Sequence, residues 1–292
     1  MAQITAALVK QLREQTGAGM MECKKALTEA DGDMDKAIDV LRTRGLAAAQ
    51  KKQGRATNEG VVAVYTSEDG KLASLLEVNC ETDFVARTDK FKDIAAGFAK
   101  AVAVADPADI DALKAVEVEG TSVADQLTEA IHIIGENMQL GKFARETLEG
   151  NGLIDSYIHG EGNIGVLVSL TCTKPETAAN DEFKTLAHDI ALQIAAMNPI
   201  AIDEASVPAD VVEHEKAIYK EQAAESGKPE EIQEKMATGR LKKFFKEVCL
   251  VDQVFVKDPD LTIKAYIAKV EKATGDQIAV AAFDRVQLGS EN

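Results

Sequence analysis

Several residue types are scarce in this chain of 292 residues, and each scarcity excludes a class of protein. There is no Trp, and aromatic residues make up only 4 % of the chain, so few side chains could stack on nucleic-acid bases. Acidic residues outnumber basic ones by 49 to 33, which gives a formal net charge of -16. Because an acidic protein repels phosphate backbones, direct binding of nucleic acid is disfavoured, and we expect a protein partner.

Cysteine and long apolar runs are also scarce. Four cysteines (Cys23, Cys80, Cys172 and Cys249) lie far apart without a C-x-x-C pair, which argues against a zinc site and predicts free thiols in a reducing compartment. The histidines lack zinc-site spacing, so we expect neither metal nor cofactor. No run approaches the roughly 18 apolar residues of a membrane span, and Met1 to Lys10 does not resemble a secretory leader. These features predict a cytoplasmic protein without membrane contact.

Residues 1–55 differ from the rest of the chain in charge and in apolar spacing. Their side chains sum to +3, which leaves -19 for residues 56–292. Apolar residues at helical spacing predict a bundle of three short helices. These residues are Ile4, Leu8 and Leu12, then Met20 to Leu27, then Met34, Ile38 and Leu41. We expect the third helix to end at Gly45, where a left-handed cap is easy, and Lys51 to Arg55 to form a polar link.

From Gly60 the apolar spacing changes to two, which is typical of strands. Asp69-Gly70 supplies a turn between two alternating runs, so a hairpin is predicted over residues 60–78. Two amphipathic helices should follow, over residues 91–102 and 123–134, and then a strand near residues 138–149. The same order recurs in the second half. It predicts a hairpin made of residues 154–158 and 164–172, a helix over residues 183–197 and a strand over residues 248–256.

We therefore predict an α+β fold. The three-helix bundle of residues 1–55 precedes two related α+β subdomains, one made of residues 56–150 and one made of residues 151–203 with 244–292. Residues 204–243 form an insert with two charged helical stretches, broken at Gly227-Lys228-Pro229. Their apolar stripe is thin, so we expect a projecting helical hairpin that meets a partner or packs on edge.

Glycine clusters could suggest nucleotide chemistry. Gly160-x-Gly162-x-x-Gly165 matches the dinucleotide fingerprint, but that motif works only where it turns a strand into a helix. Here a β run from Val166 to Leu170 follows, which favours a turn between two strands. Thr16-Gly17-Ala18-Gly19 lacks the lysine and hydroxyl of a phosphate loop. The enzyme alternative depends on the first motif.

Residues 79–85 (Asn-Cys-Glu-Thr-Asp-Phe-Val) lie where a strand passes into a helix, and two interpretations are open. In the structural one, Thr82 or Asp83 caps the helix while Phe84 and Val85 enter the core. In the functional one, Asp83 and Phe84 are exposed and form an acidic and aromatic wedge that enters a partner.

Two further places could contact a partner. Met20 and Met21 cannot both face inward on a small helix, so at least one should be exposed, and exposed methionine adapts well to an interface. The alternative is a loose bundle core beside a solvated lysine pair. His159 lies beside the glycine turn, where its imidazole can reach outward, or it serves the turn alone.

Longer segments resemble the bacterial elongation factor Ts family. Residues 16–27 (TGAGMMECKKAL) are similar to its N-terminal signature, and residues 77–85 (EVNCETDFV) are similar to its second signature. The resemblance continues through His159-Gly160, residues 164–168 and residues 226–229, so it covers nearly the whole chain.

The resemblance implies a guanine-nucleotide exchange factor for elongation factor Tu, which promotes GDP release during translation elongation. It implies a ubiquitin-associated-like bundle, in which Leu12, Met20 and Met21 touch the GTPase. Asp83 and Phe84 would insert beside the magnesium and phosphate site, Val85 would complete the contact, and His159 would pack near this wedge.

The resemblance further implies that residues 204–243 form a coiled-coil or dimerisation insert, through which the complex forms a homodimer. An exchange factor makes no bonds, so no catalytic residues are expected. A pure scaffold is the other alternative, and it differs in predicting binding without faster exchange.

Overall fold

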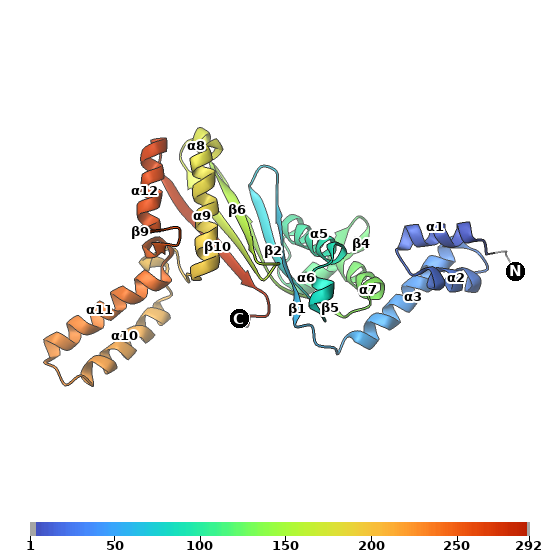
Figure 1. The fold of residues 1–292 in the computed structure, drawn as a ribbon, viewed down its shortest axis with the longest axis horizontal. Helices are drawn as coiled ribbons and strands as arrows, with labels where there is room; N and C mark the ends of the chain where they lie inside the picture. Colours follow the sequence, from blue (N-terminus) through green and yellow to red (C-terminus); the bar gives the residue numbers. More distant parts are fainter. Residues whose placement is uncertain (1–3, 291–292) are drawn as a thin grey trace.

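The computed structural model describes residues 4–290. A bundle of three helices lies at one end, two three-stranded antiparallel sheets with their helices form the body, and a helical hairpin projects from the other end (Figure 1). The predicted mixed α+β fold, with its three N-terminal helices, is confirmed. No helix among residues 4–290 combines the length and apolar character needed to span a membrane.

The N-terminal bundle consists of α1 (Ala6–Thr16), α2 (Met20–Glu29) and α3 (Met34–Lys52). Thr5 and Asp33 cap α1 and α3, and Gly17 ends α1 in the left-handed conformation with φ of 66°. The apolar spacing places its core correctly. Buried residues include Val9, Leu12, Cys23, Ala26, Leu27, Ala37 and Leu41.

The prediction that the third helix ends at Gly45 is wrong. α3 continues through Gly45 to Lys52. Lys51 and Lys52, which were predicted to lie in the polar link, therefore belong to the helix. Gly45 is buried where α3 passes α7 (Val123–Ile134), and a Cβ added to it would lie 3.6 Å from the Cβ of His132. The small residue therefore lets two helices approach each other closely and does not end one of them.

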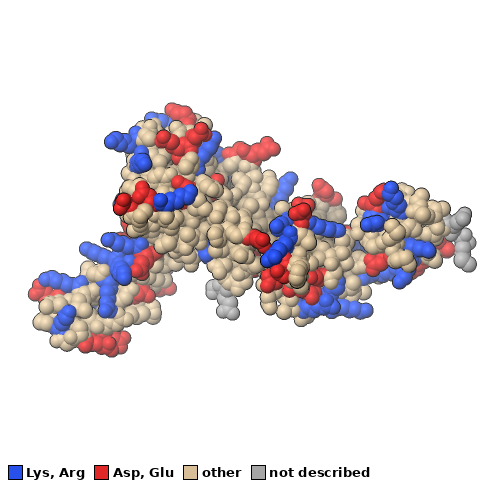
Figure 2. Space-filling model, in the orientation of Figure 1, with Lys and Arg blue, Asp and Glu red and all other residues tan. Residues whose placement is uncertain are grey.

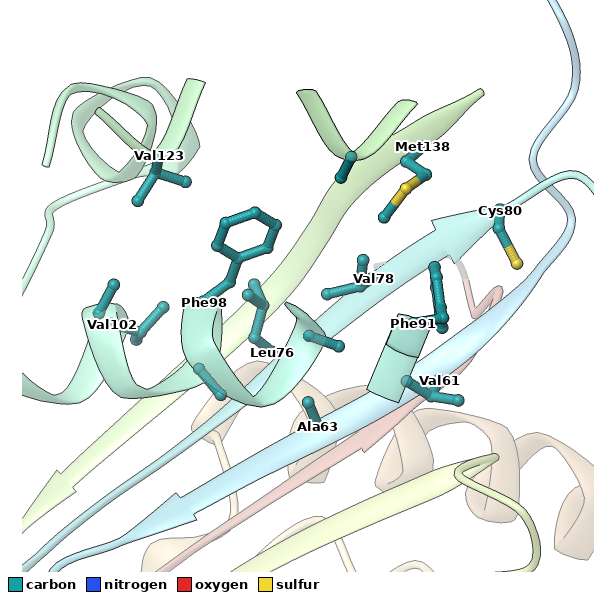
Figure 3. Close-up of a cluster of buried hydrophobic side chains, with 14 of the residues drawn as sticks. Val61, Ala63, Leu76, Val78, Cys80, Phe91, Phe98, Val102, Val123 and Met138 are labelled. Atoms are coloured by element: carbon teal, nitrogen blue, oxygen red, sulfur yellow. The ribbon is translucent and has the colours of Figure 1, made fainter. Parts of the chain in front are cut away.

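The first sheet has the order β1-β2-β5, formed by β1 (Glu59–Thr66), β2 (Leu72–Cys80) and β5 (Met138–Thr147). The hairpin and third strand of the prediction are thus confirmed. Helix α5 (Asp89–Ala105) packs on this sheet. Figure 3 shows Phe91, Phe98 and Val102 of α5 in one buried cluster with Leu76 and Val78 of β2. Shorter elements precede β5: α4 (Asp83–Ala86), α6 (Ile110–Ala115), β3 (Glu117–Val118) and β4 (Thr121–Ser122).

The second sheet repeats this arrangement with the order β10-β7-β6. It consists of β6 (Gly152–His159), β7 (Ile164–Cys172) and β10 (Ile278–Gln287), with α8 (Pro175–Ala179), α9 (Asp181–Met197) and α12 (Ile263–Thr274) beside it. As in the first sheet, a hairpin comes first, a helix follows, and a later strand pairs with the second hairpin strand.

The predicted strand over residues 248–256 is wrong. Helix α11 (Glu230–Val248) continues past residue 243 to Val248, and a 3-10 turn occupies Leu250–Asp252. Only Val254–Phe255 is extended, as β8, which pairs with β9 (Asp258–Thr262). The apolar run at this place reflects burial of Cys249 and Leu250 between elements, and burial alone does not distinguish a strand from a turn.

The projecting hairpin consists of α10 (Ala209–Ala224) and α11, and a 3-10 turn at Glu204–Ser206 precedes it. A small core fastens its base, formed by Ala201, Val207, Phe245 and Cys249. Acidic and basic side chains are interspersed along the hairpin and over the body on the face shown in Figure 2.

The two sheets share a small apolar core of their own. Its buried members are Val62, Ala73, Leu75, Ile154, Leu167 and Val286. The turn between β6 and β7 lies against β1, because the Val62 amide donates a 2.8 Å hydrogen bond to the Gly162 carbonyl. A Cβ at Gly165 would lie 2.5 Å from Val62 Cγ1, so glycine permits this close approach.

Candidate partner-binding site

A single helical turn, α4, presents the predicted wedge of Asp83 and Phe84. Thr82 caps it, since its hydroxyl accepts a 3.4 Å hydrogen bond from the Val85 amide. Val85 is half-buried against the core of the first half, and Ala86 is buried. The Phe84 side chain points outward and is 80 % exposed. The structure thus combines the two interpretations: the cap and Val85 serve the fold, whereas Phe84 remains free to meet a partner.

Glu136 clamps the backbone immediately before α4. Its Oε2 accepts hydrogen bonds from the amides of Glu81 at 3.1 Å and Thr82 at 3.0 Å. Its Oε1 accepts one from the Thr82 hydroxyl at 2.6 Å. Charge-assisted hydrogen bonds of this kind are stronger than neutral ones. The wedge is therefore carried by a restrained loop, although it is exposed.

Glu81 and Cys80 fasten the same loop to its neighbours. The Asn137 amide donates to Glu81 Oε1 at 2.6 Å, and together with Arg55 this holds the pKa of Glu81 below its ordinary value. Burial raises the pKa of Cys80 to about 12, so its protonated thiol donates to the Thr82 carbonyl at 3.2 Å. The thiol is a structural group here rather than a nucleophile.

His159 ends β6 at the glycine turn and is exposed. Its Nδ1 lies 3.1 Å from the hydroxyl of Tyr157. Gly160 and Gly162 have φ of 63° and 106°, conformations that side chains rarely adopt. The dinucleotide-like motif therefore forms a turn between two strands, as its sequence context predicts.

Arg87 connects the turn α4, which carries Phe84, with the glycine turn beside His159. Its Nη2 lies 3.4 Å from Asp83 Oδ2, and its Nε lies 2.8 Å from Glu161 Oε2 in the glycine turn. Each ion pair is exposed and contributes little stability alone. Their geometry nevertheless shows that the wedge of the first half and the His159 turn of the second half lie on one surface.

The residues predicted on the bundle divide into two kinds. Met20 and Met21 are 56 % and 64 % exposed, which confirms that at least one methionine faces outward. Leu12 is fully buried in the bundle core, so it presents no side-chain surface and instead supports the helices that carry the methionines.

Polar contacts orient the bundle against α7. Arg42 pairs with Asp125 at 2.7 Å, Glu22 lies 3.3 Å from His132 Nε2, and the Lys52 ammonium donates to the Ile131 carbonyl at 3.1 Å. Glu22 lies on the same helix as Met20 and Met21. The contacts thus fix the direction in which the methionine surface faces.

Sequence reasoning missed Glu136, Arg87, Glu161 and Tyr157. The first three are charged residues in loops or at helix ends, and the contacts of Glu136 with residues 81 and 82 and of Arg87 with Glu161 join residues far apart along the chain. Tyr157 carries a weak signal, since it lies two residues before His159 on an alternating strand and must therefore share its face.

Two other sequence features belong to the fold. Gly17 caps α1, which explains the glycines of residues 16–19 without a phosphate. His188 also serves the fold, since its Nδ1 lies 3.1 Å from Asp155 Oδ2, and the adjacent Asp189 is buried and accepts hydrogen bonds from Lys257 and Tyr266. Within residues 4–290, no group of three His, Cys, Asp or Glu side chains could hold a metal ion.

Comparison with known proteins decides the family. The family model described as Elongation factor TS matches residues 81–290. The chain is 49 % identical over 292 residues to Elongation factor Ts of Desulfovibrio desulfuricans, with 100 % of both chains covered. It is 50 % identical over 289 residues to Elongation factor Ts of Clostridium novyi, covering 98 % of this chain and 93 % of that protein. The chain belongs to the elongation factor Ts family.

As a member of the elongation factor Ts family, the chain is a nucleotide exchange factor for elongation factor Tu in translation elongation. It binds elongation factor Tu and is not an enzyme. The function implied by the two signatures is confirmed, and the enzyme and pure scaffold alternatives are excluded.

Proposed function

We propose that Asp83 and Phe84 are the wedge by which this family member releases GDP, entering elongation factor Tu beside its magnesium and phosphate site. The observation that carries the proposal is the 80 % exposure of Phe84 on a turn clamped by Glu136. A large apolar side chain held in water gains free energy when a partner covers it. Asp83 adds a negative charge, which disturbs the ions that hold the nucleotide.

One wedge is too weak to expel the nucleotide alone. Burying a Phe side chain contributes about 1.5–3 kcal/mol, whereas a nanomolar ligand is bound by about 12 kcal/mol. Factor and nucleotide must also weaken each other's binding by the same ratio. Several contacts must therefore share the effect, and we assign them to Val85, the His159 turn and the methionines of the bundle.

This assignment divides the work among the parts of the chain. The bundle of residues 1–55, which we infer to be a ubiquitin-associated-like module, docks through Met20 and Met21, with Leu12 supporting them from its core. The two sheet-containing halves, which we infer to be related because their strand orders match, supply the wedge and His159. Arg87 lies between these halves and favours their joint action.

The projecting hairpin lies away from the wedge, and we infer that it joins two copies of the complex. Its outer part has little core of its own, with Ala223 as the buried residue of α10 and Ile232 exposed by 43 % on α11. Pairing with a second copy would cover Ile232. Analytical ultracentrifugation of the complex should give a dimer that Ile232→Asp converts to the single complex; a wild-type complex that sediments as one copy would contradict the pairing.

The wedge is tested by stopped-flow release of fluorescent GDP from elongation factor Tu. Asp83→Ala combined with Phe84→Ala should slow factor-stimulated release by about 10-fold to 100-fold, the equivalent of one lost Phe contact. The fold should be retained because Phe84 contributes little to the core. Val104→Ala removes another exposed apolar side chain and is the matched control. Unchanged release in the double variant would disprove the assignment.

A further inference from the structure

Three side chains of β6 lie in a row on one face of the second sheet. Asp155, Tyr157 and His159 occupy alternate positions of the strand, so they project to the same side. Helix α9 packs along this strand and adds His188, whose Nδ1 lies 3.1 Å from Asp155 Oδ2. The row therefore runs from a histidine–carboxylate pair to the His159 turn.

Tyr157 lies at the centre of this row with its ring held on two sides. The ring packs against the core of the second half and meets the His188 ring edge-on, with 5.8 Å between centroids. The His159 ring lies 6.0 Å from it on the other side. Because such contacts fix the plane of the phenol, its hydroxyl is directed to one place, 3.1 Å from His159 Nδ1.

We propose that Tyr157 is a positioning residue for His159. Its hydroxyl donates to Nδ1, and a neutral imidazole that accepts at one nitrogen carries its hydrogen on the other. His159 therefore offers an Nε2–H donor in a defined orientation at the surface that bears the wedge. A preset donor loses less conformational entropy when it meets an acceptor of the partner than a freely rotating ring would.

This role rests on the proposed function in one respect, the contact between His159 and elongation factor Tu. The hydrogen bond itself belongs to the free protein and is measured without the partner. The two parts of the idea can therefore fail separately.

The free protein is tested by the ring nitrogen shifts of the neutral form of His159, read from long-range proton–nitrogen NMR spectra recorded over a pH series. We expect one tautomer with the hydrogen on Nε2. Tyr157→Phe keeps the ring and the fold but removes the donor, so both nitrogen shifts should move toward an average. Tyr65→Phe on the other sheet is the matched control. A wild-type His159 with averaged shifts, or with its hydrogen on Nδ1, would overturn the proposal.

Exchange kinetics test whether the positioning serves function. We expect Tyr157→Phe to slow stimulated GDP release about threefold or more, and His159→Ala to slow it at least as much. The double variant should match His159→Ala, because Tyr157 acts only through this histidine. Multiplied effects in the double variant would overturn the positioning role. Unchanged release with His159→Ala would instead remove His159 from the partner contact, while the NMR spectra still decide the hydrogen bond.

Discussion

Among single residues, Phe84 is the best placed to contribute binding energy, because its side chain is exposed while the backbone beneath it is restrained. An exposed aromatic on a mobile loop would lose much of its contact energy to ordering on binding. Here the Thr82 side chain caps the turn, Glu136 accepts a hydrogen bond from the Thr82 amide, and the Cys80 thiol donates to the Thr82 carbonyl. The proposed exchange surface is thus ordered in the free protein, before a partner binds.

Glu136 provides the first test of this preparation. Glu136→Ala removes three hydrogen bonds to residues 81 and 82. It should destabilise the loop by about 2–4 kcal/mol, since hydrogen bonds to charged groups contribute about 1.5–3 kcal/mol each and these three, which share one partly buried carboxylate, contribute less than their sum. Amide exchange at Glu81 and Thr82 should accelerate at least tenfold, and stimulated GDP release should slow.

The matched control is Glu129→Ala, which removes an exposed carboxylate from α7 in the same part of the fold. It should leave exchange at both amides unchanged. Wild-type protection of Glu81 and Thr82 in Glu136→Ala would show that the clamp is not what orders the loop.

Elements whose residues interact locally could be predicted from the sequence, and those decided by distant packing could not. The alternation around Asp69-Gly70 predicts β1 and β2 because strand spacing and turn chemistry act within a few residues. Gly45 misled the prediction, since its function depends on His132 of a helix almost ninety positions away. The apolar run after Val248 was predicted to be a strand. A turn buried against a distant helix has the same apolar sequence pattern as a buried strand, so the pattern could not distinguish the two.

The candidate site divides along the same line. Asp83, Phe84, Met20 and His159 lie in motifs that the sequence itself displays. Glu136 and Arg87 became visible only when folding placed them beside their partners. The sequence also left open whether Phe84 enters the core or is exposed, and in the structure its side chain is 80 % exposed on the turn that Thr82 caps.

Helix α2 carries a prediction at the scale of the element. Met20 begins the helix, where an acidic side chain is favoured by the helix dipole. Met20→Asp should therefore keep the bundle folded yet place a charge on the proposed interface, and calorimetry should show affinity for elongation factor Tu reduced at least tenfold. Met20→Leu, which keeps the apolar surface, should bind nearly as well as the wild type. Equal affinity of both variants would remove α2 from the interface.

At the scale of the whole molecule, the proposed function depends on how the two halves are joined, because the proposed wedge lies on one half and His159 on the other. The two sheets meet through apolar contacts around Val62 and Leu167. A pair of carboxyl groups lies beside these contacts. Glu146 of β5 lies beside Asp284 of β10, and the Ser169 hydroxyl donates to Glu146 at 3.1 Å. Burial and the neighbouring carboxyl raise the pKa of Glu146 to about 7, and burial raises the pKa of Asp284.

This pair predicts a pH dependence of stability. A raised pKa in the folded state means that folding holds a proton on this carboxyl pair more tightly than the unfolded chain does. The contribution of that proton to stability is complete below about pH 4.5 and is lost as the pH rises through about 7. Because the pair is partly exposed and solvent screens it, we expect a loss on the order of 1 kcal/mol between pH 5 and pH 8. Glu146→Gln supplies a permanent donor to Asp284, so urea unfolding should give a flatter stability profile for this variant. Glu149→Gln changes an exposed glutamate nearby and is the matched control, so its stability should depend on pH as that of the wild type does. If the stability of Glu146→Gln showed the same pH dependence as the wild type, the carboxyl pair would not be what joins the halves through a bound proton.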